Sequence, residues 1–290
     1  MPELRVIHVS DIHLSEKRAY NLKNWEICLR HIDSVKPDFV VVGGDMVLDD
    51  PDDAEDQYFA RQQMNRISAP WYAVPGNHDV GDSLPNPYKD QPVTEERLAR
   101  YKALYGDDRF AFDVAGWRFL GLNAQLLFSD LGAEEEQYRW LEGTLAASAG
   151  QHVALFLHKP LCVDTPSEDV RSGMNVDPSS RKRLLAMLGS ADVRLIASGH
   201  THRFRALSAG GVPMIWAPTT AQANTRMVEP RAGLPRQNAG MVFYRFLEDS
   251  VEWELHQPEA IVPTDITHFA AKYGAMRYSP EFRASLAEVA

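Results

Sequence analysis

Short runs of hydrophobic residues recur along the chain, and each run ends in a cluster of polar residues. The hydrophobic residues follow one another within each run instead of alternating with polar ones, which predicts strands buried on both faces. The five clearest runs are rich in Val, Ile, Leu and Phe and cover residues 4–9, 39–42, 71–74, 153–157 and 193–197.

The segments between these runs have the pattern of helices, and the alternation of helix and strand predicts a layered α/β architecture. The expected helices cover residues 21–35, 54–67, 94–105, 134–147 and 179–188. Two further strand pairs are expected, 110–114 with 118–123 and 241–247 with 251–256. Residues 163–178 show no periodicity, and we interpret them as a lid or specificity loop in preference to a passive connection.

The pattern predicts one domain over residues 1–256, followed by a C-terminal extension over residues 257–290. The regular alternation is lost from residue 257 onward, and a modest helix is expected at 280–289. This extension could pack on the domain or reach a partner subunit, so a homodimer is left open.

Composition narrows the classes of partner and compartment. With 44% hydrophobic and 24% charged residues the chain is typical of globular proteins. A net charge of -10 argues against binding to nucleic-acid polymers or to anionic membranes. The acidic run at residues 49–56 is read first as a solvated loop and second as an acidic rim that disfavours polyanions.

Two cysteines without CxxC spacing suggest buried, reduced thiols. There is no leader pattern and no apolar stretch of membrane-spanning length, so we expect a cytoplasmic protein.

Five fragments with metal-ligand residues follow the five hydrophobic runs in order. In open α/β sheets, sites form beyond the carboxyl ends of the strands, so we expect these fragments to converge on one pocket. Considered one at a time, most of these fragments have a simpler explanation: a chance match, a turn or a histidine of the core. The fragments supply seven candidate ligands, namely Asp11, His13, Asp45, Asn77, His158, His200 and His202, and one further histidine, His78.

This set of side chains suits two metal ions that share a bridging carboxylate, for which Asp45 is the natural choice. Imidazole, carboxylate and amide oxygen together favour Fe, Mn, Zn or Co over Ca or a thiolate-bound metal. Two such ions about 3.5–4 Å apart polarise phosphoryl oxygens and acidify a bound water toward a pKa of about 7. The predicted chemistry is therefore hydrolysis of phosphoesters.

The ordered motifs Asp-x-His, Gly-Asp, Gly-Asn-His-Asp, His and Gly-His-x-His resemble the calcineurin-like metallophosphoesterase family over residues 11–202. The resemblance implies a four-layer αββα sandwich with a dinuclear metal site at the carboxyl ends of the strands. It implies that Asp11, His13 and His202 hold one metal ion and that Asn77, His158 and His200 hold the other. Asp45 would bridge the two ions, and His78 would contact the substrate phosphate and assist the leaving group as an acid. Asp79 could orient His78, support the ligands or stabilise a turn.

The subgroup is indicated by a departure at Asp49, which stands where Ser/Thr protein phosphatases have a phosphate-binding arginine. A carboxylate there should repel a dianionic monoester. The segments 51–79 and 217–220 look more like the bacterial class III cyclic-nucleotide phosphodiesterases and their glycerophosphodiesterase relatives.

We therefore predict hydrolysis of small phosphodiesters by a metal-bridging hydroxide, with cyclic nucleotides as first and glycerophosphodiesters as second substrates. The alternatives are a phosphomonoesterase or nucleotide pyrophosphatase on the same metals and, more remotely, a non-catalytic scaffold of the same fold.

Overall fold

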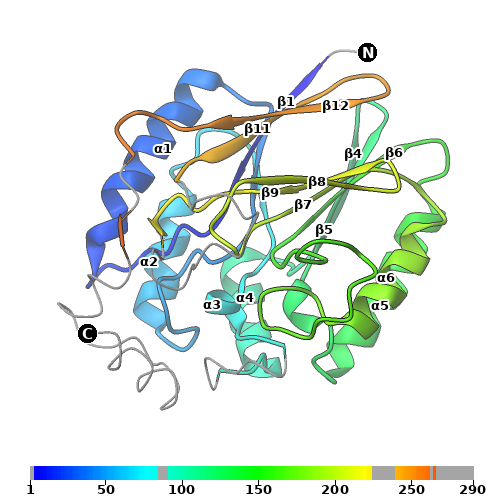
Figure 1. The fold of residues 1–290 in the computed structure, drawn as a ribbon. Helices are drawn as coiled ribbons and strands as arrows, with labels where there is room; N and C mark the ends of the chain where they lie inside the picture. The colour runs from blue at the N-terminus through cyan, green and yellow to red at the C-terminus, as the bar shows by residue number, and fades with distance from the viewer. Residues whose placement is uncertain (1–2, 84–90, 224–238, 262–263, 266–290) are drawn as a thin grey trace.

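Two β-sheets lie face to face, and helices cover the outer face of each sheet, as the computed structural model shows (Figure 1). The structure describes residues 3–83, 91–223, 239–261 and 264–265. The four layers are those of the expected αββα sandwich. The helix expected at 280–289 lies outside the described residues.

The first sheet has the strand order β12-β11-β1-β2-β3. Its parallel centre is formed by β1 (Leu4–Val9), β2 (Phe39–Val42) and β3 (Trp71–Ala73), the first three expected strands. The hairpin of β11 (Met241–Phe246) and β12 (Val251–His256) joins β1 in antiparallel register.

The second sheet has the order β4-β5-β6-β7-β9-β8. Its expected members are β4 (Phe110–Val114), β5 (Trp117–Leu122), β6 (His152–Leu157) and β7 (Asp192–Ser198). The strand pair β8 (Arg205–Ala209) and β9 (Val212–Trp216) was not expected. Exposed and partly buried residues alternate along β8 at the sheet edge, so this strand lacks the continuous hydrophobic run used to recognise the others.

Alternate residues of the buried strands serve two different cores. In β1, Ile7 and Val9 pack on the helix side with Trp25 and Ile32 of α1 (Leu22–Val35). Val6 belongs instead to the core between the sheets, together with Phe156 of β6. Strands that are covered on both faces must be hydrophobic throughout, which explains the continuous runs in the sequence.

The remaining helices complete the two outer layers. Beside α1, the first sheet carries α2 (Ala54–Met64) and α4 (Glu95–Tyr105), and a short α3 (Asn77–Val80) follows β3. The second sheet carries α5 (Gly132–Ala146) and α6 (Pro178–Leu188). Helix α2 ends three residues before the expected position 67, because Arg66 and Ile67 donate to carbonyls three residues back and form a tight turn.

The acidic run at 49–56 is not simply solvated. Asp49 and Asp56 are buried, and Asp53 caps α2 by accepting from the N–H groups of Glu55 and Asp56. Arg18 lies 3.8 Å from Asp49 and 3.7 Å from Asp56, so the two buried carboxylates share a guanidinium.

Cys28 and Cys162 are free and buried, as expected, and burial raises the pKa of both thiols. None of the helices in the described part of the chain is both long and apolar enough to cross a membrane.

Candidate metal centre

The expected ligand fragments all emerge at the same edge of the two sheets. Asp11 and His13 follow β1, Asp45 follows β2, Asn77 begins α3 after β3, and His158 follows β6. His200 and His202 follow β7 and complete the set. All seven expected ligands and His78 are therefore brought to one place from five strand ends.

The backbone at this edge adopts an unusual conformation. The φ angle is positive at Asp11 (54°), His13 (50°), Asp45 (53°), His200 (67°) and His202 (57°), a region that non-glycine residues rarely occupy. Gly76 permits the close approach of the third fragment, because a Cβ atom there would overlap Asp45. The strand exits thus turn sharply and bring their side chains together.

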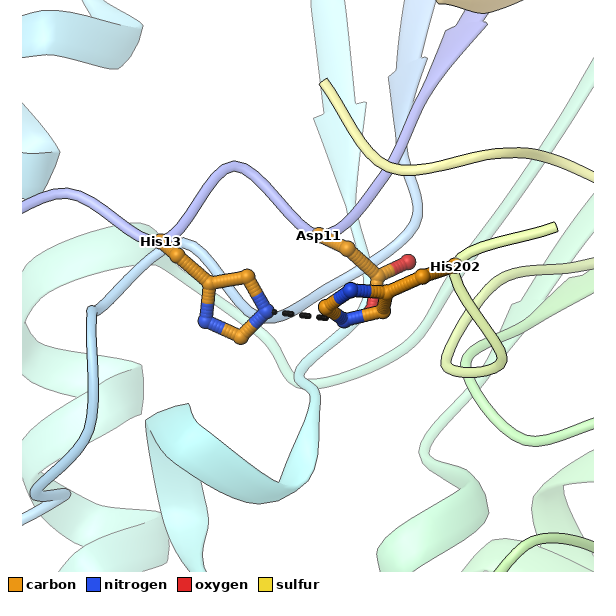
Figure 2. Close-up of side chains that lie close together, drawn as sticks. All are labelled: Asp11, His13 and His202. Atoms are coloured by element: carbon orange, nitrogen blue, oxygen red, sulfur yellow. Dashed lines mark hydrogen bonds and ion pairs between the residues drawn. The ribbon is translucent and has the colours of Figure 1, made fainter. Parts of the chain in front are cut away.

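Asp11, His13 and His202 form the first ligand group, and their side chains point toward one another (Figure 2). The Nε2 atoms of His13 and His202 are 3.1 Å apart, and His202 Nε2 is 3.3 Å from Asp11 Oδ1. The other carboxylate oxygen, Asp11 Oδ2, accepts from the backbone N–H of His200 at 2.9 Å. One oxygen of Asp11 is therefore used for positioning, and the other faces the two rings.

Asp45 lies between this group and a second one formed with His158 and His200. Its Oδ2 is 3.3 Å from His158 Nε2 and 3.8 Å from His13 Nε2, so one oxygen faces ligands of both groups. His78 Nε2 is also 3.8 Å from this oxygen, and the backbone N–H of His78 donates to Asp45 Oδ1 at 2.8 Å. This is the arrangement that a bridging carboxylate requires.

Asn77 is the expected oxygen ligand of the second group. Its Oδ1 atom is buried and has no hydrogen-bond partner among the described residues. An unpaired buried amide oxygen is costly unless another group satisfies it, and a metal ion would do so. His158 Nε2 and His200 Nδ1 lie 3.1 Å apart.

Backbone carbonyls contact one ring nitrogen in each of His13, His158 and His200, so that the other nitrogen faces the site. His13 Nδ1 is 3.1 Å from Leu48 O, and His158 Nδ1 is 2.7 Å from Gly43 O. If these Nδ1 atoms carry the proton, Nε2 is left with a lone pair for a metal ion. In His200 the arrangement is reversed, with Nε2 at 2.9 Å from Gly173 O and Nδ1 facing His158. Gly173 belongs to the loop 163–178, so that loop contacts an expected ligand directly.

Burial and mutual charge set the protonation of the site. Burial lowers the pKa of both His13 and His200 to about 4, which leaves these rings neutral at neutral pH. Burial opposes the charge on His158 as well, but the carboxylates of Asp45 and Asp11 outweigh it and raise the pKa of His158 to about 9. Burial likewise disfavours ionised Asp11, yet His202 lowers the pKa of that carboxyl to about 2. Burial opposes the charge on Asp45 too, yet His158 and His78 hold its pKa well below the usual range, so both carboxylates are ionised, as ligands must be.

Asp79 supports the backbone of the site. Its Oδ1 accepts from the N–H groups of Met46 (2.9 Å) and Val47 (3.1 Å), and its Oδ2 accepts from Gly76 N–H (2.8 Å). These bonds tie the turn after Asp45 to the turn before Asn77. Of the three readings left open for Asp79, turn stabilisation and support of the ligands describe these contacts.

Four residues at the site were not singled out from the sequence. Thr219 Oγ1 donates to the carbonyl of Asp11 at 2.7 Å, and Thr219 lies in the segment 217–220 already noted for its resemblance. The other three had no distinguishing signal, because their contacts join segments far apart in the sequence: Lys159 and Gln125 both contact Asp82, and Gly173 contacts His200.

Comparison with known proteins agrees with this geometry. A model of the calcineurin-like phosphoesterase family matches residues 4–204. The chain is 31% identical over 188 residues to "Serine/threonine-protein phosphatase CPPED1" of Homo sapiens, which covers 61% of this chain and 55% of that protein. It is 30% identical over 209 residues to "Probable glycerophosphodiester phosphodiesterase GpdQ" of Arcobacter nitrofigilis, covering 68% and 71% of the two chains. The chain thus spans about half the length of the CPPED1 proteins, with 55% covered, and a larger share of GpdQ.

A solved structure of a dimetal phosphatase from Danio rerio superposes with a TM-score of 0.60 at 14% identity. The match covers 87% of this chain and 95% of that one and concerns the fold alone.

Proposed function

Because this chain belongs to the calcineurin-like phosphoesterase family, we propose that it hydrolyses small phosphodiesters with two transition-metal ions. The observation that carries the proposal is the position of Asp45, whose Oδ2 faces His13 of one ligand group and His158 of the other. Two ion sites that share one carboxylate oxygen are the arrangement used for displacement at phosphorus.

Asp11, His13 and His202 would hold the first ion, Asn77, His158 and His200 the second, and Asp45 both. Bound ions would supply an acidified water and neutralise charge on the phosphoryl oxygens. The mixed oxygen and nitrogen ligands suit Fe, Mn, Zn or Co. In the chain itself, Leu48 O contacts the ring of His13 and Gly43 O contacts the ring of His158. These contacts hold the two rings in place, so that little reorganisation is needed when substrate binds.

His78 is the proposed acid for the leaving group. It follows the ligand Asn77 on α3, and its ring packs edge to face against His13 with centroids 4.7 Å apart. Its side chain keeps 12% of its surface exposed, more than the nearly inaccessible rings of His13 and His158. A histidine that is still reached from solvent beside the ligands can donate a proton to a departing alkoxide.

The preference for diesters rests on Asp49 and on the similarity to a probable glycerophosphodiesterase. Asp49 is buried two residues beyond Val47, within the segment that supports His13. A phosphomonoesterase is the second candidate, favoured by the similarity to a protein phosphatase and by Arg18, which offsets the charge of Asp49. Cyclic nucleotides and glycerophosphodiesters are the diesters that we propose.

Turnover of four substrates tests this choice. Metal-stripped protein given Mn²⁺ would be assayed with bis(p-nitrophenyl) phosphate, p-nitrophenyl phosphate, cyclic AMP and glycerophosphocholine. We expect diester cleavage to exceed monoester cleavage by at least about tenfold, since a dianion meets the unfavourable field of Asp49. Monoester turnover equal to or faster than diester turnover would contradict the proposal and favour a phosphatase.

The ligand assignment is tested separately with His158→Ala and Asn77→Ala. Each variant should lose one of two bound ions and at least about a hundredfold in kcat, because the second group is then incomplete. Metal content by mass spectrometry and kcat are measured together. A variant that kept both ions and full activity would show that the residue is not a ligand.

A further inference from the structure

A buried ion pair beside the second ligand group is outside the set of expected ligands. Lys159 follows His158 directly, and only 1% of its surface is exposed. Its ammonium group contacts the carboxylate of Asp82, which is 2% exposed, and donates to Ser83 Oγ at 2.9 Å. The pair therefore connects the exit of β6 to the segment that follows α3.

Gln125 extends this pair to the backbone of Asn77. It is fully buried and lies in a short helical turn after β5. With its amide nitrogen donating to Asp82 Oδ1 at 2.9 Å, its amide oxygen accepts from Asn77 N–H at 3.3 Å. Three strand exits of two different sheets are thus joined by one continuous buried polar network.

The charge of Lys159 acts on the second ligand group as well. Lys159 directly follows the expected ligand His158, and both side chains are buried, so the ammonium charge lies next to this group. In a buried environment an ammonium group without its carboxylate would repel a metal cation much more strongly than in water. Asp82 supplies the compensating negative charge at hydrogen-bond distance.

We propose that Asp82, Lys159 and Gln125 are positioning residues for the second metal ion. In this network the Lys159–Asp82 pair and Gln125 hold Asn77 and His158 at their mutual distance, and Asp82 neutralises Lys159. This inference rests on the proposed function, because it requires two ions at the ligand groups described above.

Two nearly isosteric substitutions test whether Asp82 acts by neutralising the charge of Lys159 or only by filling space in the core. Asp82→Asn keeps the shape of the side chain but leaves the Lys159 charge uncompensated beside the second ion. Lys159→Met removes the cation and leaves a carboxylate whose charge attracts metal ions. We expect Asp82→Asn to weaken binding of the second Mn²⁺ by at least about tenfold, the scale of outer contacts to metal ligands. Lys159→Met should weaken it less, by about threefold or under, because the remaining charge favours the ion.

The double variant Asp82→Asn with Lys159→Met carries no charge and is the matched control. It should bind the second ion more tightly than Asp82→Asn alone, and the first ion should be unaffected in all three variants. Stepwise Mn²⁺ affinities by isothermal titration calorimetry give these values. Urea unfolding in the presence of EDTA reports whether each variant is folded.

The outcomes distinguish this inference from the proposed function. If the unsubstituted protein binds fewer than two ions, the dimetal function fails and the network has nothing to position. If it binds two ions and Asp82→Asn keeps its second-ion affinity within about twofold, the positioning inference is wrong. Equal losses in Asp82→Asn and Lys159→Met, without recovery in the double variant, would overturn the neutralisation by Asp82.

Discussion

At the residue scale, the candidate metal centre depends on backbone conformations that could not be predicted from the sequence. Asp11, His13, Asp45, His200 and His202 all have positive φ, although none is a glycine. Each such conformation costs about 1–3 kcal/mol and persists only where surrounding contacts enforce it. Thr219, Asp79 and the carbonyls of Leu48 and Gly43 supply contacts of this kind. The residues that converge at this site could be predicted from motifs, but these supporting contacts span long sequence separations and could not.

The two ligand groups should respond differently to pH. The pKa of His158 is raised to about 9, whereas that of His13 is lowered to about 4. His158 is thus protonated at neutral pH and must lose its proton to become a ligand, while His13 is already neutral. Below pH 9 the affinity for the second Mn²⁺ should increase about tenfold for each unit by which the pH is raised. The affinity for the first Mn²⁺ should stay nearly constant between pH 7 and 9.

Calorimetric Mn²⁺ titrations at several pH values, in buffers of different ionisation enthalpy, check this expectation by counting released protons. Release of about one proton is expected with the second ion at pH 7.5. A second-ion affinity independent of pH would mean that His158 is neutral before metal binding.

At the element scale, the order of strands and helices followed from hydrophobic runs, because strands covered on both faces leave a continuous signal. The β8–β9 hairpin was missed because no residue of the edge strand β8 is buried, and its exposed and partly buried residues alternate without a continuous hydrophobic run. The loop 163–178 was correctly predicted to lack regular structure, except at its last residue, Pro178, which begins α6. Its contact from Gly173 to His200 could not be predicted, because a backbone carbonyl carries no sequence signature.

The loop 163–178 is held by Glu168, which gives an element-scale prediction. The Glu168 carboxylate accepts from the N–H groups of Val163 (2.6 Å) and Asp164 (2.9 Å). Glu168→Ala removes these hydrogen bonds, each worth about 0.5–1.5 kcal/mol at this partly exposed position. We expect the loop to open more often, so that KM for bis(p-nitrophenyl) phosphate rises about threefold to tenfold while bound metal is unchanged.

Glu135→Ala is the matched control, because Glu135 is a surface glutamate that pairs with Arg183 between α5 and α6. Its KM should equal that of the unsubstituted protein. Equal kinetics of Glu168→Ala and Glu135→Ala would show that the loop is a passive connection, the alternative to a specificity loop.

At the scale of the whole molecule, residues just beyond the domain boundary expected at residue 256 contact residues before it. Ile261 is 9% exposed and belongs to the core beneath α1 and α2. Gln257 Nε2 donates to Ala239 O at 3.3 Å, and Thr264–Asp265 (β13) pairs in parallel with Gln222–Ala223 (β10). Gln257, Ile261 and the strand 264–265 therefore contact residues 1–256, and a function of the extension in reaching a partner subunit stays a prediction.

Two truncations decide between these functions of the C-terminal extension. A chain that ends at residue 265 keeps Ile261 and the β10–β13 pair, so its free energy of unfolding should match that of the full chain. A chain that ends at residue 256 loses the burial of Ile261, which costs about 1.5–3 kcal/mol and lowers the urea midpoint. Both should still bind two ions if residues 1–256 suffice for catalysis. Light scattering on the same samples gives the molecular mass of each chain in solution. If the full chain is a dimer and the chain that ends at residue 265 is a monomer, residues 266–290 form the subunit contact. An unchanged oligomeric state in all three chains excludes that assignment.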